Sequence, residues 1–427
     1  MRVHITSNLL CERRRLDQSR LKSYFLANGC QIEEAPEEAD HIILVTCDFL
    51  KSREEQCVGQ IRDLSRHRGE LIVVGCMPAI SPDVLAREFH GKHLATKDLD
   101  EIDRFFPDFS ARFRELPDAN SFVSIGEAGG ERFVVPPELP GRPNLLARFW
   151  RDFSFGKFLD NWSFFDFKRD ALSVLLGNFA KRLIPHTMTS NVPMLRIAWG
   201  CAEKCAYCTI RTAIGPLKSK PLSVVVNEYE RLLREGHRAV RVVADNPGAY
   251  GLDIGSSLVE LMAALAKLDN GRRVVWSIHD IHPRWVIENQ ATLRQHILDG
   301  HIHELDCSIQ SGSDRILKLM NRRYAIKEIT EALRSLKEIN PRLRLVSDVI
   351  VGFPTETEDD FRMTIDALSR IGFDAVQVYP FTDRLNSIAS RMQGKVDRPT
   401  VEARLKRLFL RRPAGVKYLR FDRGDVF

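Results

Sequence analysis

Hydrophobic and polar positions alternate along this chain in two blocks, and each block has the pattern of strands separated by helices. In residues 1–105, runs of β-branched and apolar residues predict strands at Arg2–Thr6, His41–Thr46 and Leu71–Gly75, with charged helical stretches between them. Strands that alternate with helices favour a parallel sheet. We therefore expect an open α/β domain with a parallel sheet at residues 1–105.

The second block, residues 191–392, shows the same alternation with helical patterns between the apolar runs. Six strands are expected there, at Met194–Trp199, Ala239–Ala244, Arg273–Ile278, His303–Ile309, Arg344–Val351 and Ala375–Tyr379. The helical patterns between them include Leu222–Glu235, Ser256–Leu268 and Glu358–Ile371. Repeated βα units of this kind predict a partial (β/α)6 barrel, whose active site lies at the carboxyl ends of the strands.

The remaining residues, 106–190 and 393–427, lack that alternation. The first segment is rich in proline and aromatic residues and is expected to be a linker or an insertion. Its aromatic part, 144–183, either forms a peptide-docking surface or interfacial helix, or packs against its own domain. Residues 393–427 are expected to form a basic, partly helical tail, with basic residues at Arg404, Lys406, Arg407, Arg411, Arg412 and Lys417.

Composition narrows the class of protein but does not identify a partner. The net charge is +6, from 63 basic and 57 acidic residues, which permits a polyanionic partner without requiring one. No apolar run is long enough for a membrane helix, and the first residues do not resemble a secretory signal, so a cytoplasmic protein is expected. Nine cysteines in a reducing compartment favour metal binding or catalysis over disulfide bonds.

Three cysteines follow the first strand of the second block, in the segment Cys201-Ala-Glu-Lys-Cys205-Ala-Tyr-Cys208. Thiolates at this spacing can each bind one iron of a [4Fe–4S] cluster and leave the fourth iron open to a ligand that is not protein, such as S-adenosylmethionine (SAM). An electron from the cluster then breaks the sulfonium C–S bond of SAM and leaves a carbon radical. The alternative is a structural zinc site, which usually has four ligands in paired spacing, and no partner pair follows.

This CxxxCxxC motif and four later segments resemble the radical SAM superfamily and, within it, the methylthiotransferases. The segments are Val242–Gly251, Ser308–Asp314, Met320–Arg322 and Asp348–Thr357. The resemblance implies that Gln310 and Ser311 bind polar groups of SAM and that Asp348 faces the same rim. It also implies that Gly352 allows the backbone to approach a ligand and that Tyr207 packs beside the adenine. The alternatives are an ordinary turn at Ser311 and Gly312, and a structural hydrogen bond or salt bridge at Asp348.

Three further cysteines, Cys11, Cys47 and Cys76, each follow a predicted strand of the first block. Because the carboxyl ends of parallel strands meet at one edge of a sheet, these thiols are expected to converge. The alternative is that they are three independent structural thiols. The other cysteines of the chain lack that placement and are expected to be buried: Cys30, Cys57 and Cys307.

The N-terminal domain of the methylthiotransferases is similar to this block, with cysteines in segments like Val45–Cys47 and Val74–Met77 and a looser match around Cys11. The resemblance implies that these cysteines hold a second [4Fe–4S] cluster, whose open iron carries the sulfur to be transferred. It therefore implies two [4Fe–4S] clusters and SAM as both methyl donor and radical source. It also implies a reducing partner such as flavodoxin or ferredoxin, and conversion of a C–H bond to C–S–CH3.

Members of this family usually end in a small β-barrel that binds RNA or a ribosomal protein, and residues 393–427 are too short for one. We therefore expect a peptide or protein side chain as the substrate, with tRNA and a small metabolite as the alternatives. Two further hypotheses stay open. In one, the second cluster supplies bare sulfur, or supports a crosslink, without methyl transfer. In the other, the chain is a non-catalytic iron–sulfur protein that does not cleave SAM.

Overall fold

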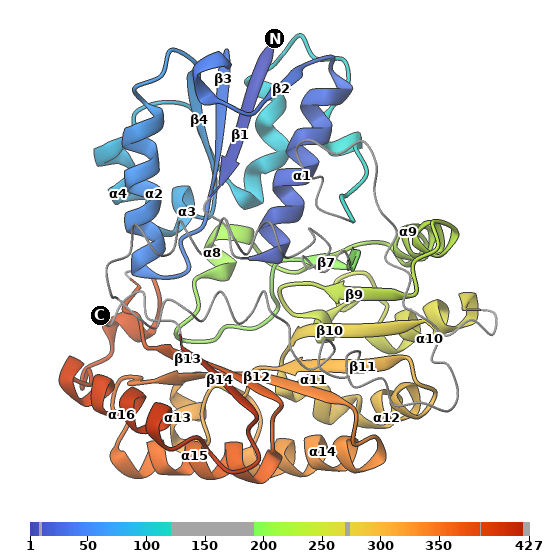
Figure 1. The fold of residues 1–427 in the computed structure, drawn as a ribbon, viewed down its shortest axis with the longest axis vertical. Helices are drawn as coiled ribbons and strands as arrows, with labels where there is room; N and C mark the ends of the chain where they lie inside the picture. The colour runs from blue at the N-terminus through green and yellow to red at the C-terminus, as the bar shows by residue number, and fades with distance from the viewer. Residues whose placement is uncertain (8–10, 121–191, 270–273, 385, 422–427) are drawn as a thin grey trace, which may run out of the picture. The chain divides into compact units, whose positions relative to one another are not determined.

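The computed structural model describes residues 1–7, 11–120, 192–269, 274–384 and 386–421. The aromatic segment at residues 144–183 lies outside the described residues, so its interpretation stays a prediction. Within the described residues, no helix is long and apolar enough to cross a membrane. The same residues contain two large parallel sheets, one in each of the two blocks recognised in the sequence (Figure 1).

Among residues 1–7 and 11–120, five parallel strands form a sheet in the order β2-β1-β3-β4-β5. Their bounds are Arg2–Ser7 (β1), Gln31–Glu33 (β2), His41–Thr46 (β3), Glu70–Gly75 (β4) and His93–Ala95 (β5). The three predicted strands are confirmed as β1, β3 and β4. The helical elements are α1 (Glu12–Ala27), η1 (Pro36–Glu38), α2 (Lys51–Leu64), α3 (Met77–Ile80), α4 (Pro82–Glu88), η2 (Thr96–Arg104) and η3 (Phe113–Glu115).

Both faces of this sheet are buried, which is why its central strands are nearly continuous apolar runs. Along β3, Ile43 and Val45 pack into one core cluster, and Ile42 and Leu44 pack into another. The first of these clusters also contains Phe106. The packed N-terminal core therefore continues beyond residue 105, where the sequence pattern places the end of the domain.

In the described part of residues 192–421, seven parallel strands form the second sheet in the order β14-β13-β12-β11-β10-β9-β6. Six of them match the predicted strands: Met194–Arg196 (β6), Ala239–Val243 (β9), Val275–Ile281 (β10), Ile302–Cys307 (β11), Arg344–Val351 (β12) and Ala375–Pro380 (β13). A short antiparallel pair, β7 and β8, stands apart from this sheet at Ala198–Trp199 and Lys218–Ser219. The expected partial barrel is thus confirmed.

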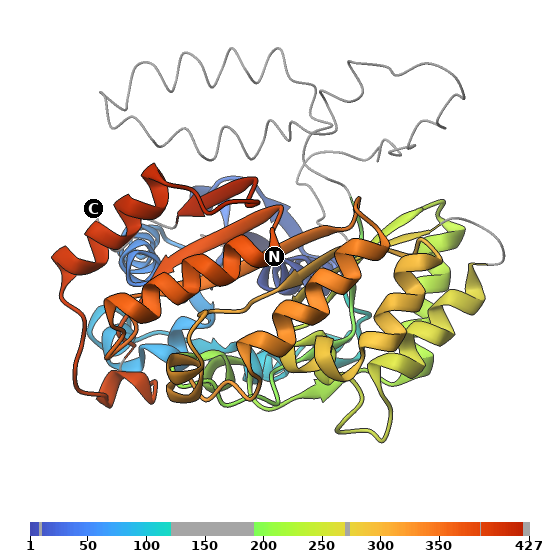
Figure 2. The same ribbon diagram turned by 90° about the horizontal axis from the view of Figure 1, so that it is seen from below.

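The longer helices that connect these strands lie along one side of the curved sheet (Figure 2). The helical elements of this region are α8 (Ile210–Ile214), α9 (Leu222–Arg234), η6 (Pro247–Ala249), α10 (Leu258–Leu268), α11 (Pro283–Glu288), α12 (Gln290–Leu298), α13 (Asp314–Leu319), α14 (Ile326–Ile339), α15 (Glu358–Ile371) and η7 (Ala389–Arg391). The apolar residues of α9, α10, α14 and α15 join the strands in one large buried cluster. This packing leaves the carboxyl ends of the strands free to carry a site.

The C-terminal residues belong to the barrel and do not form a separate tail. The predicted helix is present as α16 (Arg398–Leu410), and it is followed by β14 (Tyr418–Phe421), which pairs in parallel with β13. Arg404 of α16 is buried and forms an ion pair with Glu356 at 2.8 Å. At least one basic residue of this region therefore forms a buried ion pair inside the fold.

Candidate active site

The first cysteine trio, Cys201, Cys205 and Cys208, lies in the loop between β7 and α8. The loop begins at Gly200, whose φ of +70° is a left-handed conformation that glycine adopts readily. A Cβ atom at this position would lie 2.0 Å from the carbonyl oxygen of Pro216, so a larger residue does not fit. Because the loop follows β6, it starts at the carboxyl edge of the barrel sheet, where active sites of such folds lie.

Backbone amides of this loop point at two of its sulfur atoms. The amide of Glu203 donates to Cys201 Sγ at 3.4 Å, and the amide of Ile210 donates to Cys208 Sγ at 3.4 Å. Burial raises the pKa of each of these two thiols to about 12. A coordinated metal ion deprotonates a thiol outright, so buried thiols with amide donors aimed at sulfur suit a metal cluster. The trio therefore fits the [4Fe–4S] cluster expected from its spacing.

Arg322 is a buried arginine that contacts the same loop. Its Nη1 donates to Cys205 Sγ at 3.5 Å and to Tyr207 Oη at 3.3 Å, and only 8% of the residue is exposed. The guanidinium therefore lies beside a cysteine that the motif assigns to the cluster. Arg322 lies in a segment that matched the family, but its role becomes visible only from contacts between residues far apart in the sequence.

Asp245 and Arg13 connect this loop to the N-terminal domain. Asp245, which follows β9, accepts a hydrogen bond from the Gly200 amide at 2.9 Å. Arg13 on α1 forms an ion pair with Asp245, from Nε to Oδ1 at 3.1 Å, and a second ion pair with Asp280 on β10. Asp280 has a φ of +62°, which is uncommon for a residue other than glycine. Arg13 therefore joins the two cysteine-bearing regions, because α1 begins directly after Cys11.

Gln310 lies just beyond the end of β11 and also has a left-handed backbone, with a φ of +64°. Its amide donates to the Asp348 carbonyl at 2.8 Å, and its carbonyl accepts from the Ile350 amide at 2.9 Å. The residue is 7% exposed, and its side-chain Oε1 has no hydrogen-bond partner among the described residues. A strained backbone and a buried unpaired amide oxygen are typical of a ligand-binding position.

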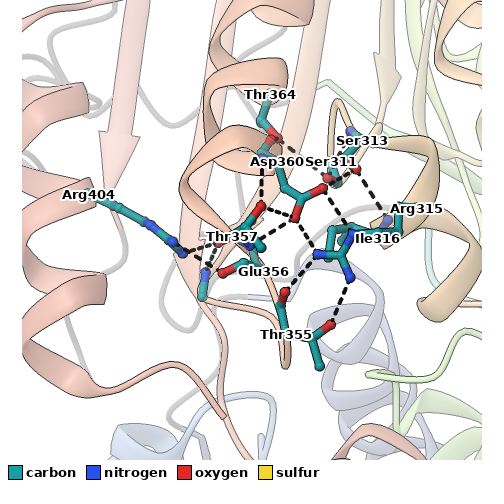
Figure 3. A network of polar contacts seen from close by, with 11 residues as sticks. Ser311, Ser313, Arg315, Ile316, Thr355, Glu356, Thr357, Asp360, Thr364 and Arg404 are labelled. Carbon is teal, nitrogen blue, oxygen red and sulfur yellow. Dashed lines mark hydrogen bonds and ion pairs between the residues drawn. The ribbon is translucent and has the colours of Figure 1, made fainter. Parts of the chain in front are cut away.

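Ser311 follows directly but is completely buried. Its Oγ lies 3.4 Å from Thr364 Oγ1 and accepts from the Ser313 amide at 3.2 Å. Figure 3 shows how α15 holds this loop, because Asp360 accepts from Ser313 Oγ at 2.6 Å and from the Thr357 amide at 2.8 Å. These contacts support the loop that carries the preceding glutamine, and a contact of Ser311 with SAM stays a prediction.

Asp348 and Gly352 lie on β12 and directly after it. Asp348 accepts a hydrogen bond from Ser308 Oγ at 2.8 Å, and burial together with the neighbouring Asp280 raises the pKa of Asp348 to about 7. Gly352 has a φ of +84°, and a Cβ atom there would lie 2.4 Å from Val401 of α16. Glycine is needed here for the turn and for helix packing, and the approach of its backbone to a ligand stays a prediction.

The second cysteine trio lies at the carboxyl edge of the N-terminal sheet. Cys11 precedes α1, Cys47 follows β3 and Cys76 follows β4, and the strands β1, β3 and β4 are neighbours in the sheet. Burial raises the pKa of Cys47 to about 12, and the nearby Cys11 adds to this effect. Burial also raises the pKa of Cys76, with further contributions from Cys47 and Cys11. The three cysteines therefore lie at one edge of the sheet, where their thiolates suit a metal cluster.

Local backbone geometry brings Cys47 and Cys76 to this edge. Gly75 has a φ of +116°, and a Cβ atom there would lie 2.4 Å from the carbonyl oxygen of Thr46. The hydroxyl of Thr46 donates to the Val74 carbonyl at 2.8 Å, so the two strand ends are held side by side. The other three cysteines are buried in apolar clusters, as predicted: Cys30, Cys57 and Cys307.

The two cysteine regions contact each other. Helix α3 directly follows Cys76, helix α8 begins two residues after Cys208, and these two helices are in contact. Arg384, which follows β13, forms buried ion pairs with Asp48 at 3.1 Å and with Glu54 at 3.2 Å. Removing one partner from a buried ion pair of this kind typically destabilises a protein by about 3–5 kcal/mol. These contacts hold the N-terminal domain against the barrel near both trios.

Comparison with known proteins agrees with this arrangement. Residues 2–95 match the family described as uncharacterized protein family UPF0004, and residues 196–368 match the radical SAM superfamily. A probable threonylcarbamoyladenosine tRNA methylthiotransferase of Pyrococcus horikoshii is 26% identical over 92% of this chain and 79% of its own length. The ribosomal protein uS12 methylthiotransferase RimO of Proteus mirabilis is 26% identical over 94% of this chain and 79% of its own length. This chain belongs to the radical SAM methylthiotransferase family.

Among solved structures, the radical SAM methyltransferase TsrM of Kitasatospora setae superposes with a TM-score of 0.55, at 11% identity over 88% of this chain and 72% of its own. At that identity the likeness shows the fold alone. As a radical SAM methylthiotransferase the chain is an enzyme, and its family implies a [4Fe–4S] cluster and SAM. The related methylthiotransferases are named for tRNA or for a ribosomal protein, so family membership does not decide the substrate.

Proposed function

We propose that this methylthiotransferase uses two [4Fe–4S] clusters to convert an unactivated C–H bond of its substrate into C–S–CH3. In this proposal Cys201, Cys205 and Cys208 hold the cluster that binds SAM, and the N-terminal trio holds a second, auxiliary cluster. The observation that carries the proposal is the contact between α3 and α8, which begin within two residues of Cys76 and Cys208. Two three-thiol sites are thereby neighbours, although they lie in different sheets.

The residues around these sites bind and position the reacting groups. When bound, the clusters and SAM supply the radical, the sulfur and the methyl group. The unpaired Oε1 of Gln310 is available to a polar group of SAM. Arg322 holds Cys205 and Tyr207 in place, and Arg13 joins the two cysteine regions through its ion pairs. Most of these groups are buried, which keeps water away from reactive species.

For the substrate we propose a peptide or protein side chain. Recognition of RNA depends on basic side chains that are free to meet phosphates. In the C-terminal region three of the six basic side chains form ion pairs with acids: Arg404 with Glu356 and Glu358, Arg407 with Glu358, and Lys417 with Asp374. This internal pairing leaves less positive charge for a polyanion than the sequence alone indicates, and it favours the peptide over the tRNA alternative.

The test is product analysis with the anaerobically reconstituted enzyme. The enzyme is incubated with SAM, a reductant and sulfide in the presence of a peptide pool or a tRNA pool, and the products are examined by mass spectrometry. We expect a peptide product that has gained one sulfur and one methyl group. A modified RNA with unmodified peptides would contradict the substrate class, and a product that gains sulfur without methyl, or only loses hydrogens, would contradict methylthiolation.

A further inference from the structure

Two histidines and an aspartate lie close together at the opposite end of the barrel strands from the cysteine loop. His296 is in α12, and Asp299 and His301 are in the turn that joins α12 to β11. One donor atom from each of the three side chains lies within 4.8 Å of the others. Because this turn precedes its strand, the cluster is at the amino edge of the sheet, whereas Gln310 and Asp348 lie toward the carboxyl edge.

The two imidazole rings approach each other through their Nδ1 atoms, which lie 3.2 Å apart. Two imidazole nitrogens bound to one tetrahedral zinc ion, each at about 2.0–2.1 Å, are separated by about 3.3 Å. The observed spacing therefore suits a shared metal ion as well as it suits a hydrogen bond between neutral rings. His296 is 8% exposed, whereas Asp299 lies at the surface, so an ion reaches the cluster from solvent.

A second layer of polar groups orients His301. Its Nε2 lies 3.3 Å from Asp269 Oδ2, and Asp269 Oδ1 accepts from Tyr229 Oη at 2.7 Å. The hydrogen-bond network continues to Trp276, whose Nε1 donates to Tyr229 Oη at 2.9 Å. The ring of Trp276 also stacks on His301, with centroids 4.7 Å apart. A carboxylate beside one ring nitrogen favours the tautomer that leaves the other nitrogen as a lone-pair donor, and metal-binding histidines are commonly oriented in this way.

The chemistry of the three donors decides which metal ion suits the cluster. A ligand set of two nitrogens and one carboxylate oxygen suits zinc and its neighbours in the first transition row, whereas magnesium and calcium prefer oxygen ligands.

We propose that His296, Asp299 and His301 bind one divalent transition-metal ion of the zinc class, with water completing its coordination. The ion joins the end of α12 to the start of β11, so it stabilises the amino edge of the barrel. The site is separate from both cysteine trios, and it is independent of whether these hold iron–sulfur clusters.

The experiment measures zinc bound to the full chain after anaerobic cluster reconstitution, incubation with Zn²⁺ and gel filtration. We expect one zinc per chain, with a zinc-edge X-ray absorption spectrum that shows nitrogen and oxygen ligands and no sulfur. His296→Gln and His301→Gln each remove Nδ1 while they keep a polar group near the Nε2 position, and both variants should lose this zinc. His93→Gln is the matched control, because His93 is exposed on β5, and it should retain the zinc.

Asp269→Asn tests the second layer without touching a proposed ligand. Asparagine still accepts from Tyr229 but lacks the carboxylate charge beside His301, so zinc affinity should fall about 10–100-fold. Equal zinc content in the wild type and in both histidine variants, or sulfur in the zinc coordination, would overturn the proposal. Absence of bound zinc from the wild type would also overturn it and would leave the two rings as a hydrogen-bonded pair.

Discussion

Asp360 offers a sharp test of how the loop that carries Gln310 is supported. This carboxylate is 4% exposed and accepts from Ser313 Oγ at 2.6 Å, from the Thr357 amide at 2.8 Å and from Arg315 (Figure 3). Burial alone raises the pKa of Asp360, but hydrogen bonds from Arg315, Ser313 and Thr357 outweigh burial and hold the pKa well below its usual range.

We expect Asp360→Ala to destabilise the barrel by about 3 kcal/mol. Hydrogen bonds to a charged group contribute about 1.5–3 kcal/mol each, and the substitution removes those from Ser313 and Thr357. The side chain of Arg315 is 49% exposed, so solvent screening makes its ion pair a minor contribution. Asp360→Asn keeps one acceptor oxygen and should reduce the free energy of unfolding by about half as much. SAM affinity should fall in both variants, because the loop before α13 is no longer held by α15.

The assay is urea unfolding at several pH values, with SAM binding measured on the same samples. The folded state binds the Asp360 proton less tightly than the unfolded chain does, so the stabilisation is present at neutral pH. It should be lost as the pH falls below about 4, the ordinary pKa of an aspartate. Asp359→Ala is the control, because the neighbouring Asp359 side chain is 81% exposed. The reasoning is refuted if Asp360→Ala shifts stability no more than this control at pH 7.

Three further predictions concern the site residues. Arg322→Lys removes the planar donor that contacts Cys205, so SAM cleavage should fall at least about tenfold while the iron content is retained. Unchanged cleavage would contradict the positioning role of Arg322. Burial and a neighbouring carboxylate raise the pKa of Asp348 to about 7, so the folded state holds this proton and loses stability as the pH rises. Asp348→Asn should therefore resist urea better than the wild type at pH 8 but not at pH 4. Gly352→Ala should destabilise by at least about 1 kcal/mol in thermal unfolding, because φ is +84° and the methyl group meets Val401; an unchanged midpoint would show that the turn relaxes.

Much of the fold is predictable because both sheets are parallel and the N-terminal sheet is buried on two faces. Its strands β3 and β4 are nearly continuous apolar runs, and they stand out against the charged helices between them. β2 and β5 have three residues each and β14 has four, so they give no periodic signal of their own. They form strands because each pairs with a strand at the edge of an existing sheet. This is an effect of tertiary structure, which the local sequence does not reveal.

The candidate site also has a part that the sequence predicts and a part that only the structure shows. The cysteine positions follow from spacing and from strand ends, because chemistry and topology restrict both. The pairing of Arg384 with Glu54 spans 330 positions and leaves no pattern in the sequence. Ser311 and Gly352 lie in loops that a motif can identify, but a motif does not reveal which groups of a loop are used for packing. For these two residues the structure shows hydroxyl contacts to Thr364 and a close approach to Val401.

The central claim is that each cysteine trio holds its own cluster, and iron counting with SAM cleavage on matched variants tests it most directly. The anaerobically reconstituted wild type should contain about eight irons per chain, as two [4Fe–4S] clusters require. The combined variant Cys11→Ala, Cys47→Ala and Cys76→Ala should retain about half of that iron and still cleave SAM. A wild type with one cluster, or a triple variant that keeps all its iron but no longer cleaves SAM, would contradict the account.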